Sequence, residues 1–265
     1  MPFIRYIGES IEVSEITTDL VLEYISKLYD RPLADASRAT YIRHIKAFVR
    51  WLKDKYNIPV ALSEIEMPKV AKKLVHILTV DEIKSLFECI KCESEWMRWR
   101  NCAIVAFMLS SGLRQNEVAT LLWNNIYTGQ GYAVVHGKGN KERCVPLGNL
   151  VGIYLEKYKE LCPFQSDFVF VERHGEPLTN NAIKLLIQKL KRQTGIDFSS
   201  HKLRHNFATN YCRESLEETG QCDAYTLQVL MGHENVKTTE GYMHYAHSLV
   251  ASRNSHSYLD KVFGV

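Results

Sequence analysis

The sequence predicts a mainly helical protein with a small antiparallel β-sheet, divided into a helical N-terminal domain and a larger second domain. Apolar residues recur at helical spacing through most of the 265 residues. Residues 132–147 depart from that spacing and predict a β-hairpin around a glycine-rich turn. Residues 57–78, with Pro59 and Pro68 and little periodicity, predict a linker, which places the domains at residues 1–70 and 76–265.

Two helices are predicted before the linker. Thr18 can cap a helix that runs to about Tyr29, and Ser37 can cap a second helix that runs to about Tyr56. The first 15 residues show no good helical period, so no helix is expected there.

Thr79 and Glu82 form a predicted capping box that begins the second domain. Helices are then expected at about residues 79–91, 96–111, 115–122, 149–161, 180–193, 201–213 and 223–231. The hairpin strands are expected at residues 132–135 and 143–147. Tyr242 is expected on the next helix or just before it.

Bulk properties exclude several classes of protein. The longest wholly apolar run, Cys102–Leu109, is too short to span a bilayer, and Met1–Ser10 lacks the features of a secretion signal. We therefore expect a cytoplasmic protein without membrane association. Cys89-x-x-Cys92 invites a zinc interpretation, but no second pair follows at finger spacing, so no metal site is predicted. The net charge of +3 says little by itself about partners.

Four motifs in the second domain carry the candidate catalytic residues. They are the stretches 112–117 (GLRQNE), 137–143 (GKGNKER), 201–205 (HKLRH) and 230–242, in which Tyr242 lies nine residues after His233. Together they supply two arginines, a lysine, two histidines and a tyrosine. Each motif alone is a weak indicator, but four in one order favour the transfer of a phosphodiester to a tyrosine and back without a metal.

That chemistry requires charge stabilisation, a nucleophile and a leaving-group acid. Arg114 and Arg204 can neutralise the charge that develops on the phosphate oxygens. Lys138, on a Gly-Lys-Gly turn, is the candidate general acid for the departing sugar oxygen. We expect Tyr242 to be the nucleophile. His201 is a candidate acceptor of the phenol proton, and His233 a candidate hydrogen-bond partner of the phosphate. The sequence shows neither a paired-carboxylate cluster nor a nucleotide-binding motif, so no cofactor is expected.

The order and spacing of these motifs resemble the tyrosine recombinase (phage integrase) family, closest to its Xer-type and small integrase branches, over roughly residues 15–247. The resemblance assigns the catalytic roles to Arg114, Lys138, His201, Arg204, His233 and Tyr242, with Glu117 as the supporting acid of Arg114. The sequence departs from the family pattern at Met231, where leucine is usual. The family's N-terminal domain usually has four or more helices, so either a helix is lost or replaced here or the chain is a shortened version.

The resemblance also implies an activity and an assembly. It implies site-specific recombination of double-stranded DNA through a 3′-phosphotyrosyl intermediate and a Holliday junction, with the two domains closing on the duplex as a C-shaped clamp. We accordingly expect a monomer in solution, a homo-tetramer on DNA, accessory DNA-bending proteins and a nucleoid-associated location.

Basic residues near the N-terminus are the first candidates for DNA contact. Between Arg31 and Lys73 the sequence has ten basic and four acidic residues. From the helix alone a solvated face is the simpler interpretation, but the catalytic motifs favour phosphate contacts. The predicted DNA contacts are Arg43, Lys46, Arg50, Lys53, Lys69, Lys72, Lys73, Lys141 and Arg143.

Several alternatives remain open at this stage. The tail carries an apolar patch formed by Tyr258, Leu259, Val262 and Phe263, which either folds on its own domain or docks on a neighbouring subunit. The same catalytic residues would also suit DNA relaxation of type IB topoisomerase character. A non-catalytic DNA-binding protein would need a broken active site, and a metal-dependent nuclease would need the missing carboxylates.

Overall fold

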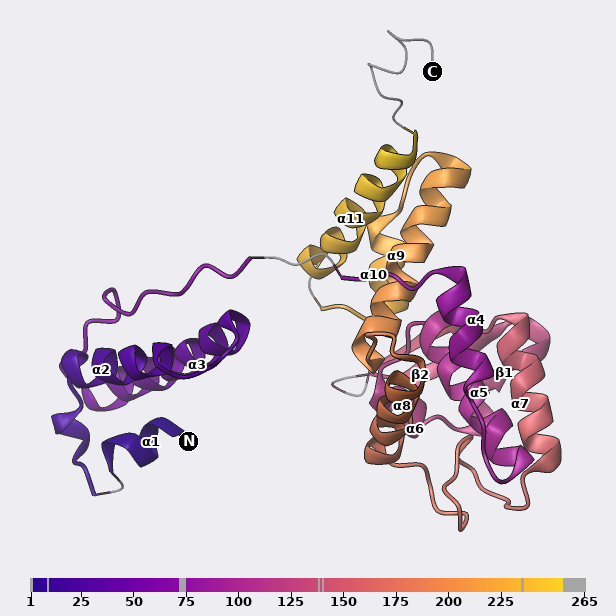
Figure 1. The fold of residues 1–265 in the computed structure, drawn as a ribbon, viewed down its shortest axis with the longest axis horizontal. Coiled ribbons are helices and arrows are strands. Elements are labelled where there is room, and N and C mark those ends of the chain that lie inside the picture. The colour runs from indigo at the N-terminus through magenta and orange to yellow at the C-terminus, as the bar shows by residue number, and fades with distance from the viewer. Residues whose placement is uncertain are drawn as a thin grey trace, which may run out of the picture. The chain divides into compact units, whose positions relative to one another are not determined.

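The computed structural model describes residues 2–8, 10–71, 75–137, 139, 141–234 and 236–254, without the side chains of residues 237, 238, 253 and 254. The chain divides into two compact units, residues 1–73 and 74–265 (Figure 1). Each unit has its own apolar core. The predicted fold class, mainly helical with a small antiparallel sheet, is confirmed.

The first unit consists of α1 (Pro2–Ile7), α2 (Thr18–Tyr29) and α3 (Asp35–Tyr56), with a 3-10 turn at Val13–Glu15. The expectation of no helix before residue 15 is therefore wrong. Six residues are too few to show a helical period, and α1 is stabilised instead by tertiary packing. Phe3 is buried, and its ring centroid lies 5.2 Å from that of Tyr24.

Two of the predicted helix caps in this unit are wrong. Thr17, not Thr18, caps α2, because its hydroxyl accepts from Leu20 N at 3.3 Å. The Thr18 hydroxyl instead accepts from Ala61 N at 2.9 Å. Helix α3 begins two residues before Ser37, without a side-chain cap.

The chain after α3 folds back onto the first unit. Ile58, Val60 and Ile65 are buried in its core, so this part of the predicted linker belongs to the unit. Lys53 Nζ donates to Val60 O and Lys46 Nζ donates to Ile65 O, both at 2.6 Å. These two lysines therefore tie α3 to the segment that follows it.

The second unit is larger and contains most of the helices. Its helices are α4 (Val80–Glu88), α5 (Glu95–Ser110), α6 (Gln115–Ala119), α7 (Asn149–Leu161), α8 (Asn180–Thr194), α9 (Ser200–Thr219), α10 (Ala224–Met231) and α11 (Val236–Asn254). The predicted capping box of Thr79 and Glu82 is confirmed at the start of α4. Helix α5 is buried almost all round and packs against α6, α7 and α9. None of the helices in the described ranges is long and apolar enough to cross a membrane.

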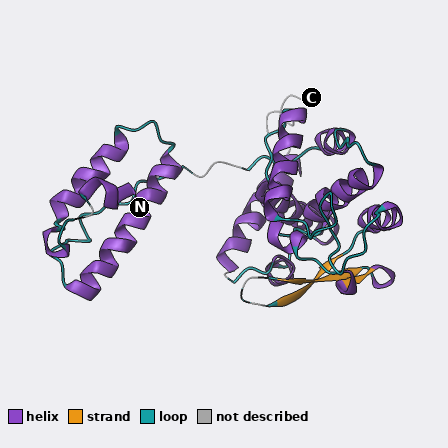
Figure 2. Ribbon diagram, turned by 90° about the horizontal axis from the view of Figure 1, so that it is seen from below, coloured by secondary structure: helices purple, strands orange, loops and turns teal. Residues whose placement is uncertain are grey.

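The sheet consists of β1 (Ile126–Tyr127), β2 (Tyr132–His136) and β3 (Glu142–Pro146) in antiparallel order β1-β2-β3. The predicted hairpin is confirmed, with Val134 opposite Cys144. Figure 2 shows the sheet along one side of the unit, with helices against one of its faces. Strand β1 was not predicted, because two residues cannot show alternation.

A separate apolar cluster joins α9, α10 and α11. Phe207 and Cys212 of α9 pack in it with Leu227 and Met231 of α10 and with Tyr242 of α11. Large side chains buried in this way each contribute about 1.5–3 kcal/mol. Tyr242 therefore lies on the helix after α10, as predicted, and it packs in this cluster.

Candidate active site

Three arginines from three different elements meet at the C-terminus of α10. Residues 230–232 present successive carbonyl oxygens there. Arg143 Nε donates to the first at 2.8 Å, a terminal nitrogen of Arg204 donates to the second, and Arg114 Nη2 donates to the third at 2.9 Å. The negative end of a helix dipole favours cations at this position. The last turn of α10 thus holds all three guanidinium groups in place.

Gly232 makes this arrangement possible. Its φ of +58° is in the left-handed region, where side chains are strained. A Cβ atom at this position would also lie 3.1 Å from Cδ and Nη1 of Arg143. Glycine is therefore favoured by the backbone turn, and a side chain here would also have to push Arg143 aside by a few tenths of an ångström.

Glu117 lies between two of these arginines and is 2% exposed. Arg143 grips its carboxylate with two bonds of 2.7 and 2.8 Å, and Arg114 adds a side-chain bond of 2.8 Å and a backbone bond of 2.7 Å. Burial alone would raise the pKa of Glu117, but the hydrogen bonds and charge of Arg143, followed by those of Arg114, outweigh it and hold the pKa at about 2. Glu117 is thus an anion that binds both Arg114 and Arg143, and its role as the supporting acid of Arg114 stays a prediction.

Arg204 is almost fully buried and also donates to Gly112 O. Burial lowers its pKa to about 10, and the charge of Arg114 acts in the same direction, so the guanidinium stays protonated at neutral pH. Gly112 has a φ of +61°, and a Cβ there would collide with the Phe207 ring.

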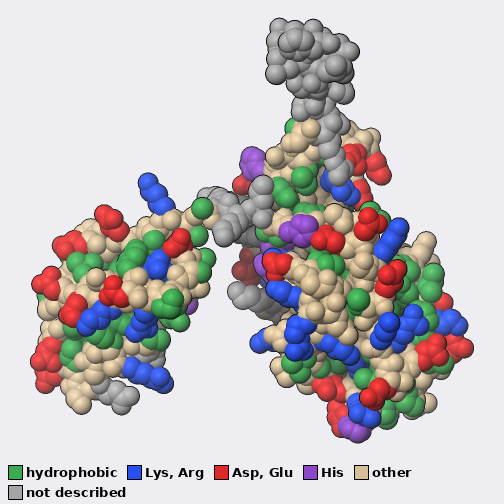
Figure 3. Space-filling model, viewed as in Figure 1, with side chains coloured by type: hydrophobic (Ala, Val, Ile, Leu, Met, Phe, Trp, Pro, Cys, Tyr) green, Lys and Arg blue, Asp and Glu red, His purple; other side chains and the backbone are tan. Residues whose placement is uncertain are grey.

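A cavity of about 560 Å³ opens beside these groups. Arg114, His201 and Arg204 line it together with Lys184 and Lys191 of α8. Figure 3 shows Lys and Arg side chains gathered over the region of α8. A recess with this charge suits a phosphate group.

The Tyr242 ring lies among histidines and is 6% exposed. The His205 ring centroid is 4.9 Å away in an edge-on arrangement, and the His233 ring is 6.0 Å away and nearly parallel. His201 packs edge-on against His205 at 4.5 Å. His233 Nδ1 lies 3.0 Å from the Thr239 hydroxyl, which fixes the orientation of the ring.

Burial, aided by the local positive charges, keeps these imidazoles neutral. Burial lowers the pKa of His205 and of His233 to about 4, and the charge of Arg204 adds to the effect in both. Burial also lowers the pKa of His201, which the charges of Arg204 and Arg114 lower further. For Tyr242, burial raises the pKa of the phenol, whereas the charges of Arg204 and Arg114 act to lower it. The two guanidinium groups therefore act electrostatically on the phenol.

His205 was missed by the sequence analysis. It lies one helical turn after His201, which places the two rings on the same face of α9. The four-residue spacing of the two histidines in the HKLRH motif already predicts that their rings share a face. It does not predict that Tyr242 packs beside His205.

The predicted DNA contacts fall into four groups. Arg43, Arg50, Lys69 and Lys141 are exposed, whereas Lys46 and Lys53 are partly buried and bind backbone carbonyls. Lys72, Lys73 and the predicted general acid Lys138 lie outside the described residues. The prediction for Arg143 is wrong: its side chain is 8% exposed and its guanidinium binds Glu117 and a carbonyl of α10. An arginine close to a hairpin turn looks exposed in sequence, but this one lies on β3 and its side chain points into the protein.

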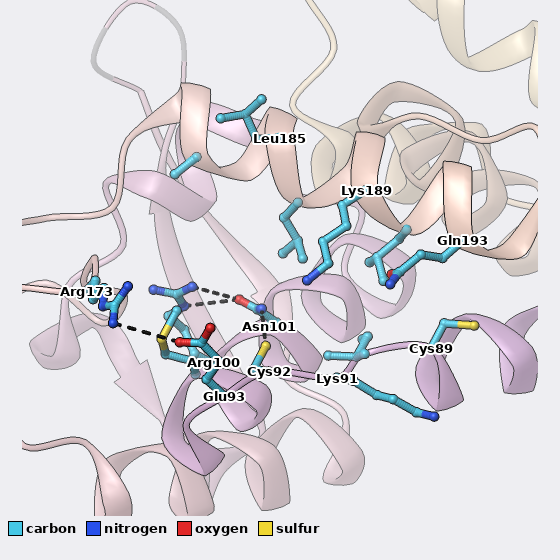
Figure 4. Close-up of a pocket in the computed structure, with 15 residues that line it drawn as sticks. Cys89, Lys91, Cys92, Glu93, Arg100, Asn101, Arg173, Leu185, Lys189 and Gln193 are labelled. Carbon is cyan, nitrogen blue, oxygen red and sulfur yellow. Dashed lines mark hydrogen bonds and ion pairs between the residues drawn. The ribbon is translucent and has the colours of Figure 1, made fainter.

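Another cavity, of about 390 Å³, lies between the α4–α5 connection and α8 (Figure 4). There Arg100 is buried and donates to Asn101 Oδ1 and, at 2.7 Å, to Val171 O. Asn101 Nδ2 donates to Cys92 Sγ at 3.2 Å. The sulfur atoms of Cys89 and Cys92 point to different parts of the cavity in Figure 4. Across the described ranges, no group of three or more His, Cys, Asp or Glu side chains is arranged to hold a metal ion.

Comparison with known proteins gives the class to which this fold and site belong. The model of the phage integrase family matches residues 76–248, which is more than half of the chain, and the chain belongs to that family.

Within the family, the chain is similar to Xer-type tyrosine recombinases. It is 30% identical over 254 residues to tyrosine recombinase XerD of Halalkalibacterium halodurans, covering 91% of this chain and 83% of that protein. It is also 30% identical over 253 residues to tyrosine recombinase XerC of Pediococcus pentosaceus, covering 91% and 82%. The resemblance found in the sequence is thereby confirmed.

Solved structures share the fold. The XerH site-specific recombinase bound to a palindromic difH substrate, in a post-cleavage complex, superposes with a TM-score of 0.72 at 22% identity, covering 95% of this chain and 75% of that one. A lambda integrase (75–356) dimer bound to a COC′ core site gives a TM-score of 0.66 at 19% identity, covering 92% and 86%.

Proposed function

We propose that this protein carries out site-specific DNA recombination by cutting and rejoining strands through a covalent bond between Tyr242 and a DNA 3′-phosphate. The observation that carries the proposal is that Arg114 and Arg204 line one cavity and that both charges act on the Tyr242 phenol. Membership of the phage integrase family and 30% identity to proteins named tyrosine recombinases support it.

Fixed positive charge is the proposed source of catalysis. Arg114 and Arg204 line the cavity, and backbone carbonyls hold both before any substrate arrives. Charge that is already oriented stabilises the transition state without reorganisation, and losing one such donor typically costs about 10²–10³ in rate. We therefore assign both guanidinium groups to the non-bridging oxygens of the phosphate.

Proton transfer is assigned to neighbouring groups. A neutral imidazole can accept the phenol proton of Tyr242, and His201, on the wall of the cavity, is the proposed acceptor. His233 is proposed to bind a phosphate oxygen. Lys138 is proposed to protonate the leaving sugar oxygen. The resulting phosphotyrosine ester conserves the energy of the broken bond, so rejoining needs no cofactor.

The burial of Tyr242 means that the proposed reaction needs a movement of the protein. A ring that is 6% exposed cannot reach a DNA phosphate without some local movement. We infer that the first turns of α11 shift when DNA binds, which would bring the phenol towards the cavity.

The proposed partner is double-stranded DNA. In support, the XerH structure holds a palindromic difH substrate and the lambda integrase structure holds a COC′ core site. We propose that the chain is a monomer without DNA and a tetramer on it, that recombination passes through a Holliday junction, and that accessory DNA-bending proteins assist. We also propose a cytoplasmic, nucleoid-associated location, because the proposed partner is DNA.

Recombination can be separated from its alternatives with plasmids. A plasmid with two copies of the sequence that flanks the gene should recombine in EDTA and yield four-way junction intermediates. The Tyr242→Phe variant should bind the same DNA without recombining it. Relaxation of a plasmid without these sites, with no strand exchange, would instead support a topoisomerase-like activity. Loss of activity in EDTA would support a metal-dependent nuclease.

A further inference from the structure

Arg143 occupies an unusual position for a basic residue of a DNA-binding hairpin. Its side chain is 8% exposed, compared with 37% for Arg114. Its two terminal nitrogens bind both oxygens of Glu117, and its Nε binds Leu230 O. The Arg143 side chain therefore points into the protein, where it lies against the carboxylate that also binds Arg114.

The charges explain why a second arginine matters here. A buried carboxylate beside a single guanidinium would cancel most of the positive charge that the guanidinium offers to a phosphate. In this site two guanidinium groups share one carboxylate, because Arg114 Nη1 and Arg143 Nη1 both bind Glu117 Oε1 at 2.8 and 2.7 Å. The three-residue group thus keeps a net positive charge, and its more exposed member is Arg114.

The hydrogen-bond geometry shows that the Glu117 carboxylate pairs mainly with Arg143. Arg143 makes two parallel bonds to Glu117, the strongest pairing available to these groups, whereas the Arg114 side chain makes one. Arg114 directs its other terminal nitrogen to Gly232 O. Gly137 also lies against the pair, since a Cβ there would be 3.4 Å from Arg143 Nη1.

We propose that Arg143 is a positioning residue that neutralises Glu117, so that Glu117 orients Arg114 without cancelling its charge on the DNA phosphate. This inference rests on the proposed function, because it gives Arg143 a role only in a reaction that uses Arg114. If the proposal holds, the loss of Arg143 slows the reaction only while Glu117 is charged.

The test is an epistasis measurement on the full chain. Adduct formation is timed on a nicked duplex with the sequence that flanks the gene. Arg143→Gln should slow the reaction by about 10²–10³, the scale for losing oriented charge. In a Glu117→Gln background the same change should cost less than about threefold, because no carboxylate remains to cancel Arg114. A Glu117→Gln/Arg143→Gln protein that is more than about tenfold slower than Glu117→Gln would overturn the proposal.

The design remains decisive if Arg143→Gln fails to fold. The double variant removes both buried charges together and replaces them with amides that can hydrogen-bond to each other, so it avoids an unpaired buried ion. Its rate relative to Glu117→Gln then decides alone. Arg143→Lys provides a further arm: it keeps the charge but loses the two-bond fork, so it should be slower than the unaltered chain and faster than Arg143→Gln. A loss as large as that of Arg143→Gln would overturn the proposal.

Two further arms separate this role from others. A substrate with a 5′-bridging sulfur needs no leaving-group acid. Arg143→Gln should still form the adduct slowly on this substrate. Full recovery of the rate would overturn the proposal, because it would mean that Arg143 supports the leaving-group acid Lys138 instead. Lys157→Gln, an equal loss of charge on the exposed face of α7, should leave the rate unchanged. If the unaltered chain forms no adduct, the proposed function is overturned. If the unaltered chain and Arg143→Gln form the adduct at equal rates, only the inference about Arg143 is overturned.

Discussion

At the scale of the residue, Gly232 shapes the site through its backbone conformation and its lack of a side chain. Its left-handed backbone turns the chain after α10, and its missing Cβ leaves room for Arg143. Gly232→Ala should therefore destabilise the protein by about 1–2 kcal/mol through backbone strain, with a further loss of adduct formation as Arg143 is displaced.

Gly195→Ala is the matched control for this prediction. Gly195 ends α8 with a φ of +71°, and a Cβ there would meet nothing within 4 Å. Both variants should show a lower thermal midpoint, but only Gly232→Ala should lose more adduct formation than its lost stability explains. Equal losses of activity in the two variants would mean that strain, not the arginine contact, is responsible.

The buried imidazoles predict a pH dependence of stability. His205 and His233 have a pKa of about 4 in the folded protein and about 6.5 when unfolded, so between these values the unfolded chain binds more protons. The free energy of unfolding should consequently fall as the pH falls from about 7 towards 4. Glu117, with a pKa of about 2, contributes a loss only at lower pH, below about 4.5.

Urea denaturation at pH 7, 6 and 5 measures this effect. His205→Asn removes one of the two groups, so its stability should decline less steeply with falling pH than that of the unaltered chain. An identical slope would show that the His205 imidazole is not held neutral in the fold.

Sequence reasoning at this scale found the chemistry but not the contacts. The residue types at positions 114, 117, 204 and 242 and their order were enough to expect a charged site around a tyrosine. Whether a guanidinium faces DNA or a carboxylate depends on the direction of a side chain, which spacing along the chain does not encode. Arg143 was misassigned for that reason.

At the scale of the element, α3 carries two kinds of basic residue. Arg43 and Arg50 are exposed and line a groove with Lys46, Met67 and Pro68. Changing both arginines to glutamine should weaken DNA binding and reduce the slope of log affinity against log salt by about 1 for each residue, as expected for lost phosphate contacts. Thermal stability should be unaffected.

Lys46→Gln gives a contrasting result on the same helix. Because Lys46 Nζ donates to Ile65 O, its loss should lower the stability of the first unit by about 1 kcal/mol. Salt titrations of DNA affinity and thermal melts of the same proteins measure both effects. An unchanged salt slope for the Arg43→Gln/Arg50→Gln protein would remove α3 from the DNA-binding surface.

Elements with a long apolar period were predictable, and short ones were not. The range predicted for α7 is the one observed, residues 149–161, because thirteen residues show several helical turns. Helix α1 and strand β1 are too short to show a period and depend on tertiary contacts such as the packing of Phe3. Residues 57–65 were assigned to a linker because prolines hide the burial of Ile58, Val60 and Ile65.

At the scale of the whole molecule, the proposed assembly depends on the chain beyond α11. Its apolar residues Tyr258, Leu259, Val262 and Phe263 lie outside the described residues, so their docking stays a prediction. A chain that ends at Ser252 should still form the adduct on nicked DNA, because the catalytic groups precede it. It should lose the tetramer and strand exchange.

Sedimentation with and without the two-site DNA, beside the recombination assay, measures this separation. Normal recombination by the shortened chain would contradict a role for the tail between subunits. Assembly was the least predictable level from sequence, because an apolar patch packs equally well on its own chain or on a neighbour.

The claim on which the account depends is that fixed arginines, and not a bound cation, activate one phosphate for attack by Tyr242. The most direct test is to incubate the protein with nicked DNA in EDTA, isolate the covalent adduct and map the modified peptide by mass spectrometry. We predict an adduct at Tyr242 that forms equally well in EDTA, disappears in Tyr242→Phe and slows by about 10²–10³ in Arg114→Ala. An adduct on another residue, or one that requires a divalent metal, would contradict the account.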